Sequence, residues 1–143
     1  KSGEDAVATF SNYGKDNVDL FAPGVDIYST TPDGGYEHFD GTSMASPVVA
    51  GVAATIRSYF PDLSAEQVKD VLMSSTVATQ NAKVVKPGSE EVVPFNELSV
   101  TGGVVNSYHA AKKASTVKGK KKAGEGAAGS GGAGKGGKKN GRA

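Results

Sequence analysis

Short runs of apolar, β-forming residues alternate with polar turn segments over residues 6–31. The runs at 6–10 and 18–22 are rich in β-forming residues, and residues 25–31 alternate between apolar and polar side chains. Turn residues separate these runs, because Pro23-Gly24 is a turn dipeptide and the segment 32–35 (Pro-Asp-Gly-Gly) is typical of a tight, hairpin-like turn. The pattern predicts short strands here, with residues 36–40 returning as extended chain.

From Ser43 onward the apolar residues recur at helical spacing. The recurring positions are Val49, Val52, Ala53, Ile56, Tyr59 and Phe60. Few polar residues interrupt the first turns, and a helix that is apolar all round is usually buried. Proline is tolerated in the first turn of a helix, so Pro47 places the start close to Ser43, and Pro61 ends the helix. We therefore predict a buried helix over this segment.

A second helix is predicted directly after Pro61. Ser64 is a good N-cap and Gln67 stands at the capping-box position. Leu63 and Val68 have the spacing of a hydrophobic staple, and we expect the helix to end near residues 74–75. Beyond it, residues 82–86 and 91–95 are expected to form short strands around a turn at 87–88, and a final helix is expected from about Asn106.

Charge divides the chain into an acidic and a basic part. Residues 1–111 hold six Lys/Arg and fourteen Asp/Glu, a net charge of −8, whereas residues 112–143 hold ten Lys/Arg and one Glu, a net charge of +9. Large apolar residues almost vanish after position 117, so this segment buries too little surface to offset its ordering entropy. We predict a folded part over residues 1–116 and a disordered Gly/Lys/Ala tail over residues 117–143.

Composition excludes several classes of site. The chain has no cysteine, which removes disulfides, thiolate metal sites and a cysteine nucleophile. No stretch reaches the roughly 20 apolar residues of a membrane-spanning helix. The first residues include neither an initiating Met nor the apolar region of a signal peptide, and we interpret this start as a cut through a longer protein.

Ser43 has the local setting of a nucleophile. A serine hydroxyl needs a base to accept its proton and donors to hold an oxyanion. A helix N-terminus offers unpaired N–H groups and the positive end of the helix dipole, and Gly41 and Thr42 leave room for a substrate carbonyl. From the residues alone, an ordinary N-cap serine is the alternative, because most serines at helix starts are caps.

The segment around Ser43 closely resembles the serine motif of the subtilisin-like serine proteases. It reads Gly-Thr-Ser-Met-Ala-Ser-Pro over residues 41–47 and continues Val-Val-Ala-Gly, with Val48 where the family commonly has His. Four further segments resemble the same family: 8–14, the Ala-Pro-Gly segment 18–30, the helix pair around 59–75 and the closing helix 103–111. The resemblance covers roughly residues 6–113, the C-terminal part of the catalytic domain.

This resemblance implies an α/β fold, namely part of a parallel sheet flanked by helices. It implies peptide-bond hydrolysis through an acyl-enzyme, with Ser43 as the nucleophile and its backbone N–H as an oxyanion donor. Gly41 and Thr42 would border the oxyanion, and Met44 and Phe39 would border the leaving-group side. A Met beside the nucleophile is also sensitive to oxidation, because its sulfoxide is polar.

The family's Asp, His and oxyanion Asn lie upstream of the segment that this chain resembles, and none is carried over. His38 and His109 are the only histidines. His38 stands about 16 Å before Ser43 if the chain is extended, so a strand histidine is the simpler interpretation. His109 falls on the last predicted helix, where we expect it to face solvent. As an isolated polypeptide the chain is expected to be inactive.

Other ligands and partners are weakly indicated. Family members often bind calcium, but Asp33, Glu37 and Asp40 lack the spacing of a dedicated calcium loop, and a solvated acidic face is the alternative. We expect no cofactor and no metal site. The basic tail has no aromatic residue for base stacking, which favours a solubilising tail or linker over a nucleic-acid or membrane partner.

Two functions follow as hypotheses. The first is a secreted or cell-envelope serine endopeptidase, acting on protein or peptide substrates and completed by the upstream part of its own catalytic domain. The second is a truncated, non-catalytic homologue that serves as a binding or structural piece.

Overall fold

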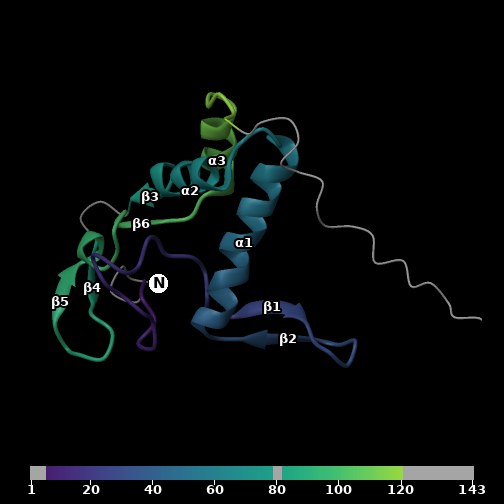
Figure 1. Ribbon diagram of the computed structural model, residues 1–143. Helices are drawn as coiled ribbons and strands as arrows, with labels where there is room; N and C mark the ends of the chain where they lie inside the picture. The colour runs from purple at the N-terminus through teal and green to yellow at the C-terminus, as the bar shows by residue number, and fades with distance from the viewer. Residues whose placement is uncertain (1–5, 79–81, 121–143) are drawn as a thin grey trace, which may run out of the picture.

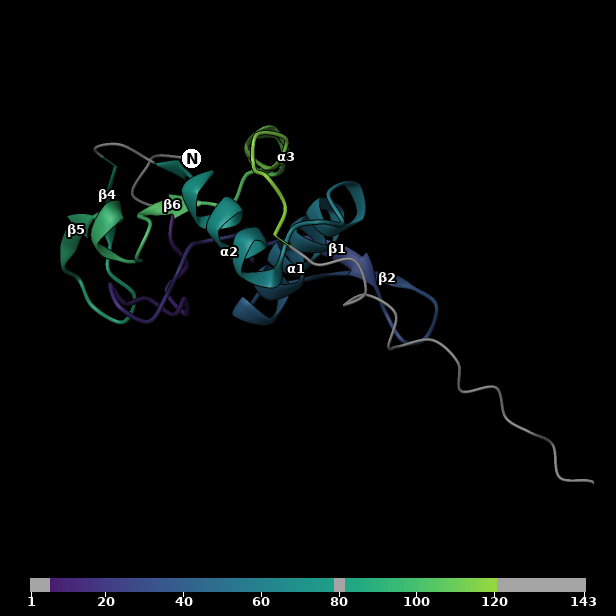
Figure 2. The same ribbon diagram turned by 45° about the horizontal axis from the view of Figure 1, so that its top comes forward.

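Three helices and three small antiparallel strand pairs make up the computed structural model, which describes residues 6–78 and 82–120. The helices are α1 (Thr42–Tyr59), α2 (Ala65–Ser74) and α3 (Ser107–Ala114); α2 and α3 lie together at the top of Figure 1, and α1 runs from them down to the β1–β2 hairpin. Figures 1 and 2 place the β1–β2 pair and the β4–β5 pair on opposite sides of α1. The predicted α/β class is confirmed.

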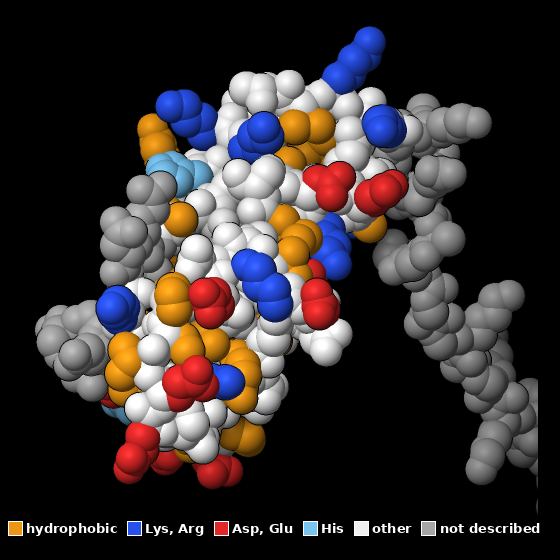
Figure 3. All heavy atoms as spheres, turned by 90° about the vertical axis from the view of Figure 1, so that its left-hand side faces the viewer, with side chains coloured by type: hydrophobic (Ala, Val, Ile, Leu, Met, Phe, Trp, Pro, Cys, Tyr) orange, Lys and Arg blue, Asp and Glu red, His pale blue; other side chains and the backbone are white. Residues whose placement is uncertain are grey.

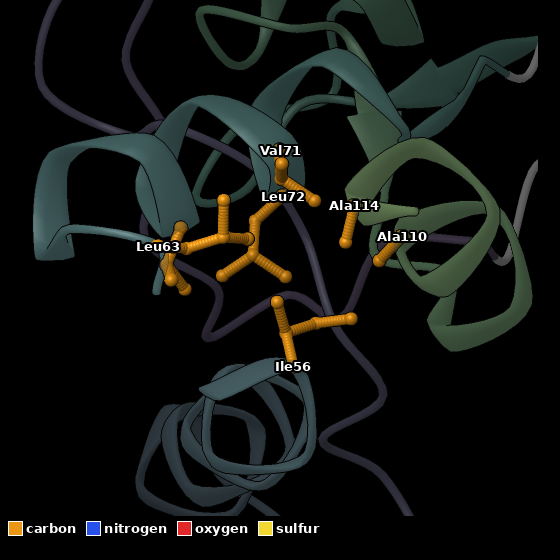
Figure 4. Packing of buried hydrophobic residues seen from close by; sticks show 7 residues of the cluster. Ile56, Leu63, Val71, Leu72, Ala110 and Ala114 are labelled. Atoms are coloured by element: carbon orange, nitrogen blue, oxygen red, sulfur yellow. The ribbon is translucent and has the colours of Figure 1, made fainter. Parts of the chain in front are cut away.

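The main core lies where the three helices meet (Figure 4). Ile56 of α1 points toward Val71 and Leu72 of α2, and Ala110 and Ala114 of α3 complete the contact. All of these side chains are buried. The small alanines let α3 approach the other two helices closely. The side chains that meet in this core from α1 and α2 belong to the apolar faces predicted for these helices.

The local signals for α2 and α3 are confirmed. The Ser64 side chain accepts a bond from the Gln67 N–H (3.2 Å), and the Gln67 side chain accepts one from the Ser64 N–H (3.1 Å). Asn106 caps α3 by accepting a bond from the His109 N–H at 2.8 Å. Each cap satisfies backbone donors that a helix start leaves unpaired, and this fixes where the helix begins.

Two expectations for α1 were wrong. Pro47 is the sixth residue of the helix and not part of its first turn, so the Ser43 carbonyl loses its ordinary partner in the helix ladder. Ile56 is the one fully buried residue of α1, although a buried helix was predicted. Among the described residues, α2 and α3 are the main elements that pack along this helix, and much of its small apolar side faces solvent.

Strand pairing is mostly antiparallel. The strands β1 (Ile27–Thr30) and β2 (Tyr36–Phe39) form a hairpin, as do β4 (Lys83–Val85) and β5 (Val92–Pro94), in agreement with the predicted turns. The pairing of β3 (Val77–Ala78) with β6 (Gly103–Val104) was not predicted.

Parallel pairing is present along residues 18–21. This segment exchanges backbone hydrogen bonds with residues 100–105, and Phe21 and Val104 form a parallel bridge. The strand predicted at 18–22 therefore appears as a short parallel contact. The strand predicted at 6–10 was wrong, because that segment turns back on itself through a bond from the Ser11 N–H to the Ala8 carbonyl.

A second, smaller core lies under β4 and β5. It contains Val84, Val93, Phe95 and Leu98, and the Phe21 ring lies 5.0 Å from the Phe95 ring. The short 3-10 turn Phe95–Glu97 (η2) follows β5, and Lys15 donates to the carbonyls of Asn96 (2.7 Å) and Ser99 (3.1 Å) beside it. This core holds the segment that leads into β1.

Residues 118–120 are held against the start of α2. Gln67 donates to the Lys118 carbonyl (2.8 Å) and accepts from the Lys120 N–H (3.0 Å). The prediction of disorder for residues 117–143 falls mostly on positions 121–143, which lie outside the described residues.

On the face shown in Figure 3, basic side chains gather toward the top, where α3 lies, and acidic ones dominate the bottom. Within the described ranges, no helix is long and apolar enough to span a bilayer.

Candidate active site

A glycine turn places Ser43 at the start of α1. Gly41 has φ 155° and ψ 160°, a region that essentially only glycine occupies. Its N–H donates to the Gly24 carbonyl at 2.7 Å, and a Cβ on Gly24 would lie 2.8 Å from the Gly41 carbonyl oxygen. Two glycines from separate motifs therefore allow the backbone contact that orients the start of the helix.

Two N–H groups at the start of α1 are not used by the described protein. The Gly41 carbonyl accepts bonds from the N–H groups of Met44 (3.0 Å) and Ala45 (3.3 Å). Over the described part of the chain, the N–H groups of Thr42 and Ser43 have no protein acceptor, and both residues are exposed. Free N–H groups at the positive end of a helix dipole suit a developing oxyanion. No side chain caps this helix, so Ser43 is not acting as an N-cap.

Ser43 lines a cavity between α1 and the β1–β2 hairpin. The cavity has a volume of about 390 Å³, and its walls include Met44, Pro47 and Val48 from α1 and Ile27 and Phe39 from the hairpin. The structure thus brings together three of the predicted site residues, Ser43, Met44 and Phe39. Ile27 and Pro47 were not predicted as site residues from the sequence, because the cavity that they line forms only where the hairpin lies against the helix.

The other two predicted residues open onto a neighbouring cavity. Gly41 and Thr42 line a space of about 730 Å³ together with residues 6–11 and 21–25. Lys86 lies at the rim, and its hydrogen bond to Glu91 (3.1 Å) raises the pKa of the Lys86 ammonium above its usual range. Ser43 and Thr42 are therefore adjacent in the helix but line different cavities.

Neither histidine is paired with Ser43. The His38 Nδ1 lies 2.7 Å from a carboxylate oxygen of Asp26, and His109 lies on α3 next to the Tyr108 ring. In the described segments the Ser43 hydroxyl makes no hydrogen bond to any side chain. The pairing of Asp26 with His38 was missed, because it joins two positions that become neighbours only when the hairpin forms.

No metal centre is apparent among residues 6–78 and 82–120, where no three His, Asp or Glu side chains are grouped closely enough to hold an ion. The acidic residues Asp33, Glu37 and Asp40 are spread along the hairpin and its approach to α1. Calcium, which the family resemblance allows, is therefore assigned to no site in these segments.

Comparison with known proteins places this arrangement in context. The sequence model described as the subtilase family matches residues 2–132. Subtilisin DY of Bacillus licheniformis is 52% identical over 68 residues, which are 48% of this chain and 24% of that protein. Subtilisin-like protease 1 of Plasmodium berghei is 35% identical over 117 residues, which are 82% of this chain and 17% of that protein.

Solved structures agree with the sequence matches. A structure titled for the assembly of subtilase cytotoxin SubAB has a TM-score of 0.59 and 26% identity, covering 71% of this chain and 28% of that one. A protease from Pseudoalteromonas arctica gives 0.57 and 29%, covering 73% of this chain and 31% of that one. The chain thus spans about a quarter or less of the length of the curated relatives cited here. Because the family match extends over most of its length, the chain belongs to the subtilase family.

Proposed function

We propose that Ser43 is the nucleophile of a serine endopeptidase. The observation that carries this proposal is the exposed Ser43 at the start of α1, beside free helical N–H groups and a cavity, in a chain of the subtilase family. Its Oγ would attack the scissile carbonyl carbon, and a base would take the hydroxyl proton. Collapse of the tetrahedral intermediate would break the C–N bond and leave an acyl-enzyme, which water then hydrolyses.

The rest of the catalytic machinery comes, in this proposal, from the upstream part of the same catalytic domain. That part would supply the base, its Asp partner and the oxyanion Asn, since His38 and His109 do not contact Ser43. The exposed side of α1, which includes Ala50, Gly51 and Ala54, offers a surface of small residues for it to pack against. Protein or peptide substrates and a secreted or cell-envelope location follow from the family as part of the same proposal.

Labelling with a fluorophosphonate probe tests the proposal. The chain alone should not be labelled, because no base is in reach of Ser43. After mixing with the upstream part of the domain, Ser43 should become labelled, and Ser43→Ala should abolish this. Ser46→Ala is the matched control, since Ser46 is also exposed on α1 and should be dispensable. If the complete domain is not labelled at Ser43, the proposed nucleophile is wrong.

One observation supports the competing, non-catalytic function. The only histidine near the start of α1 is bound to Asp26 and not to Ser43, so the described residues assemble no charge-relay pair on the nucleophile. The upstream coding sequence separates the two functions. A reading frame without an Asp-Gly, a His-Gly-Thr-His-like and an Asn-containing segment would favour the non-catalytic homologue.

A further inference from the structure

The outer face of the β1–β2 hairpin carries an exposed row of aromatic rings. Tyr28 is paired with His38 and Thr30 with Tyr36, so these side chains share one face. The Tyr28 ring stacks on Tyr36 with centroids 5.5 Å apart and lies 4.7 Å from the His38 ring. Tyr28 and Tyr36 remain 61% and 59% exposed, so their mutual packing leaves most of this aromatic surface in contact with solvent.

The aromatic row lies on the face of the strand pair opposite to Ile27 and Phe39. Ile27 and Phe39 form the neighbouring pair in the register, and both line the cavity against α1. Side chains alternate between the two faces of a strand pair, so Tyr28, Tyr36 and His38 lie on the opposite face from Ile27 and Phe39. Tyr28 also forms part of the cavity wall, so the row begins at the edge of that cavity. The hairpin extends from the base of α1 and stands apart from the two cores (Figures 1 and 2).

The aromatic row is held in place at one end. Asp26 has φ 58°, a conformation that residues with a side chain rarely adopt. Its N–H donates to an Asp40 carboxylate oxygen at 2.6 Å, and its own carboxylate lies 2.7 Å from His38 Nδ1. These contacts fix the His38 ring against Tyr28, so a partner would meet a surface that is already ordered.

Charge around the hairpin has a single sign. Residues 16–56 contain no Lys or Arg. The hairpin and its approach carry four carboxylates, Asp26, Asp33, Glu37 and Asp40, and within the described residues none of them is paired with a Lys or Arg. Aromatic faces attract cations, and nearby carboxylates strengthen that attraction.

We propose that this outer face is a docking surface for a lysine- or arginine-bearing segment of a partner protein. Basic side chains would stack on the Tyr28–Tyr36–His38 row, and Asp26 and Asp40 would accept hydrogen bonds from them at one end. Charge complementarity argues for this occupant over an acidic or apolar one. The docking does not require Ser43 to be a nucleophile, although it would bring a bound protein close to that residue.

Fluorescence anisotropy with a labelled Gly-Lys-Arg peptide tests the docking surface on the full chain. We expect saturable binding that weakens when salt is raised from about 0.05 to 0.3 M, because the contact is between exposed charges. Tyr28→Ala should weaken binding about fivefold by removing the central ring of the row. Tyr28→Phe should keep most of the affinity, since the aromatic face remains.

Two further variants control for charge and for fold. Asp26→Asn should weaken binding while keeping the backbone, because Asn also adopts positive φ. Tyr108→Ala is the matched control, since Tyr108 is an exposed tyrosine beside a histidine on another element, and it should leave binding unchanged. Binding to wild type and to Tyr28→Ala with equal affinity would overturn the proposal.

Other occupants give different results. If the peptide binds only after residues 121–143 are deleted, the surface belongs to the chain's own basic segment and the proposal of a separate partner is wrong. If peptide binding is lost when the upstream part of the domain is added, the domain itself covers the surface, and the proposal of a separate partner is again wrong. Fluorophosphonate labelling of Ser43 is a separate measurement, so the failure of one proposal does not imply failure of the other.

Discussion

At the scale of single residues, the site depends on backbone conformations that only some residues tolerate. Gly41 adopts φ 155°, and Gly24 leaves room for the Gly41 carbonyl at a distance where a Cβ would not fit. Asp26 adopts φ 58° and is held by Asp40 and His38. The nucleophile and the aromatic row are therefore both oriented by turns at the open end of one hairpin, one before β1 and the other after β2.

Replacing Gly41 by alanine should disturb the start of α1. We expect Gly41→Ala to lower the free energy of unfolding by about 1–3 kcal/mol, because alanine is strained at this backbone conformation. Urea unfolding followed by circular dichroism measures the change. Gly51→Ala is the control, since Gly51 lies inside α1 with nothing within 4 Å of an added Cβ, and it should stabilise the chain by about 0.5–1 kcal/mol. An equal effect of both substitutions would contradict this account of Gly41.

At the scale of elements, Ile56 is the one buried residue through which α1 contacts α2 and α3, and Val49, Val52 and Ala53 pack around the same core. Ile56→Ala should lower the free energy of unfolding by about 2–5 kcal/mol, because it leaves a cavity among α1, α2 and α3. Thermal unfolding measures the loss. Ser58→Ala, on the exposed side of the same helix, should change stability by less than about 0.5 kcal/mol. A small effect of Ile56→Ala would mean that the three helices do not pack as described.

Gln67 connects the start of α2 to the end of the described chain. Ser64→Ala removes one cap bond and should cost about 1 kcal/mol. Gln67→Ala removes its bonds to Ser64, Lys118 and Lys120 and should cost about 2 kcal/mol. It should also speed amide hydrogen exchange at Lys120, which Ser64→Ala should affect less. Exchange at Lys120 that is unchanged in Gln67→Ala would argue against this attachment.

Elements with local signals were predictable, and elements that depend on distant partners were not. The Ser64–Gln67 capping box, the turn at 32–35 and the start of the last helix near Asn106 are encoded within a few residues, and all were confirmed. The segment 6–10 has β-forming residues but no strand partner, so it forms a turn. The β3–β6 pair joins residues far apart in the chain, and no local pattern marks it.

The candidate site divides in the same way. Ser43 and Met44 belong to the motif at 41–47, Phe39 stands just before it, and all three share a cavity. The Asp26–His38 pair and the exposed aromatic row were not foreseen, because both depend on the register between β1 and β2. The burial predicted for α1 was too high. Its apolar sequence indicates a buried helix, but the described residues cover only part of its surface.

At the scale of the whole molecule, the described chain has two small cores and one helix that is covered on one side. Ile56 and its neighbours form one core, and Val84, Phe95 and their neighbours form the other. Native domains are only marginally stable even with a complete core. We therefore expect the chain alone to unfold at a lower temperature than the chain bound to the upstream part of the domain.

The upstream part of the domain should stabilise the chain by binding its folded form. A partner that binds only the folded state adds about 2.7 kcal/mol when present at 100 times its Kd. The midpoint of thermal unfolding should therefore keep rising with the logarithm of the concentration of the upstream part once that concentration exceeds the Kd. A variant with Ala50→Lys should weaken this effect, because a charged side chain would enter the packed side of α1. Ser58→Lys should reduce the rise in midpoint only if the upstream part contacts the last turn of α1. Lys112→Glu on α3 is the control and should leave the rise in midpoint unchanged. If the midpoint does not move with the upstream part, the exposed side of α1 is not where the domain is completed, and Ser43 would lack the base that its proposed function requires.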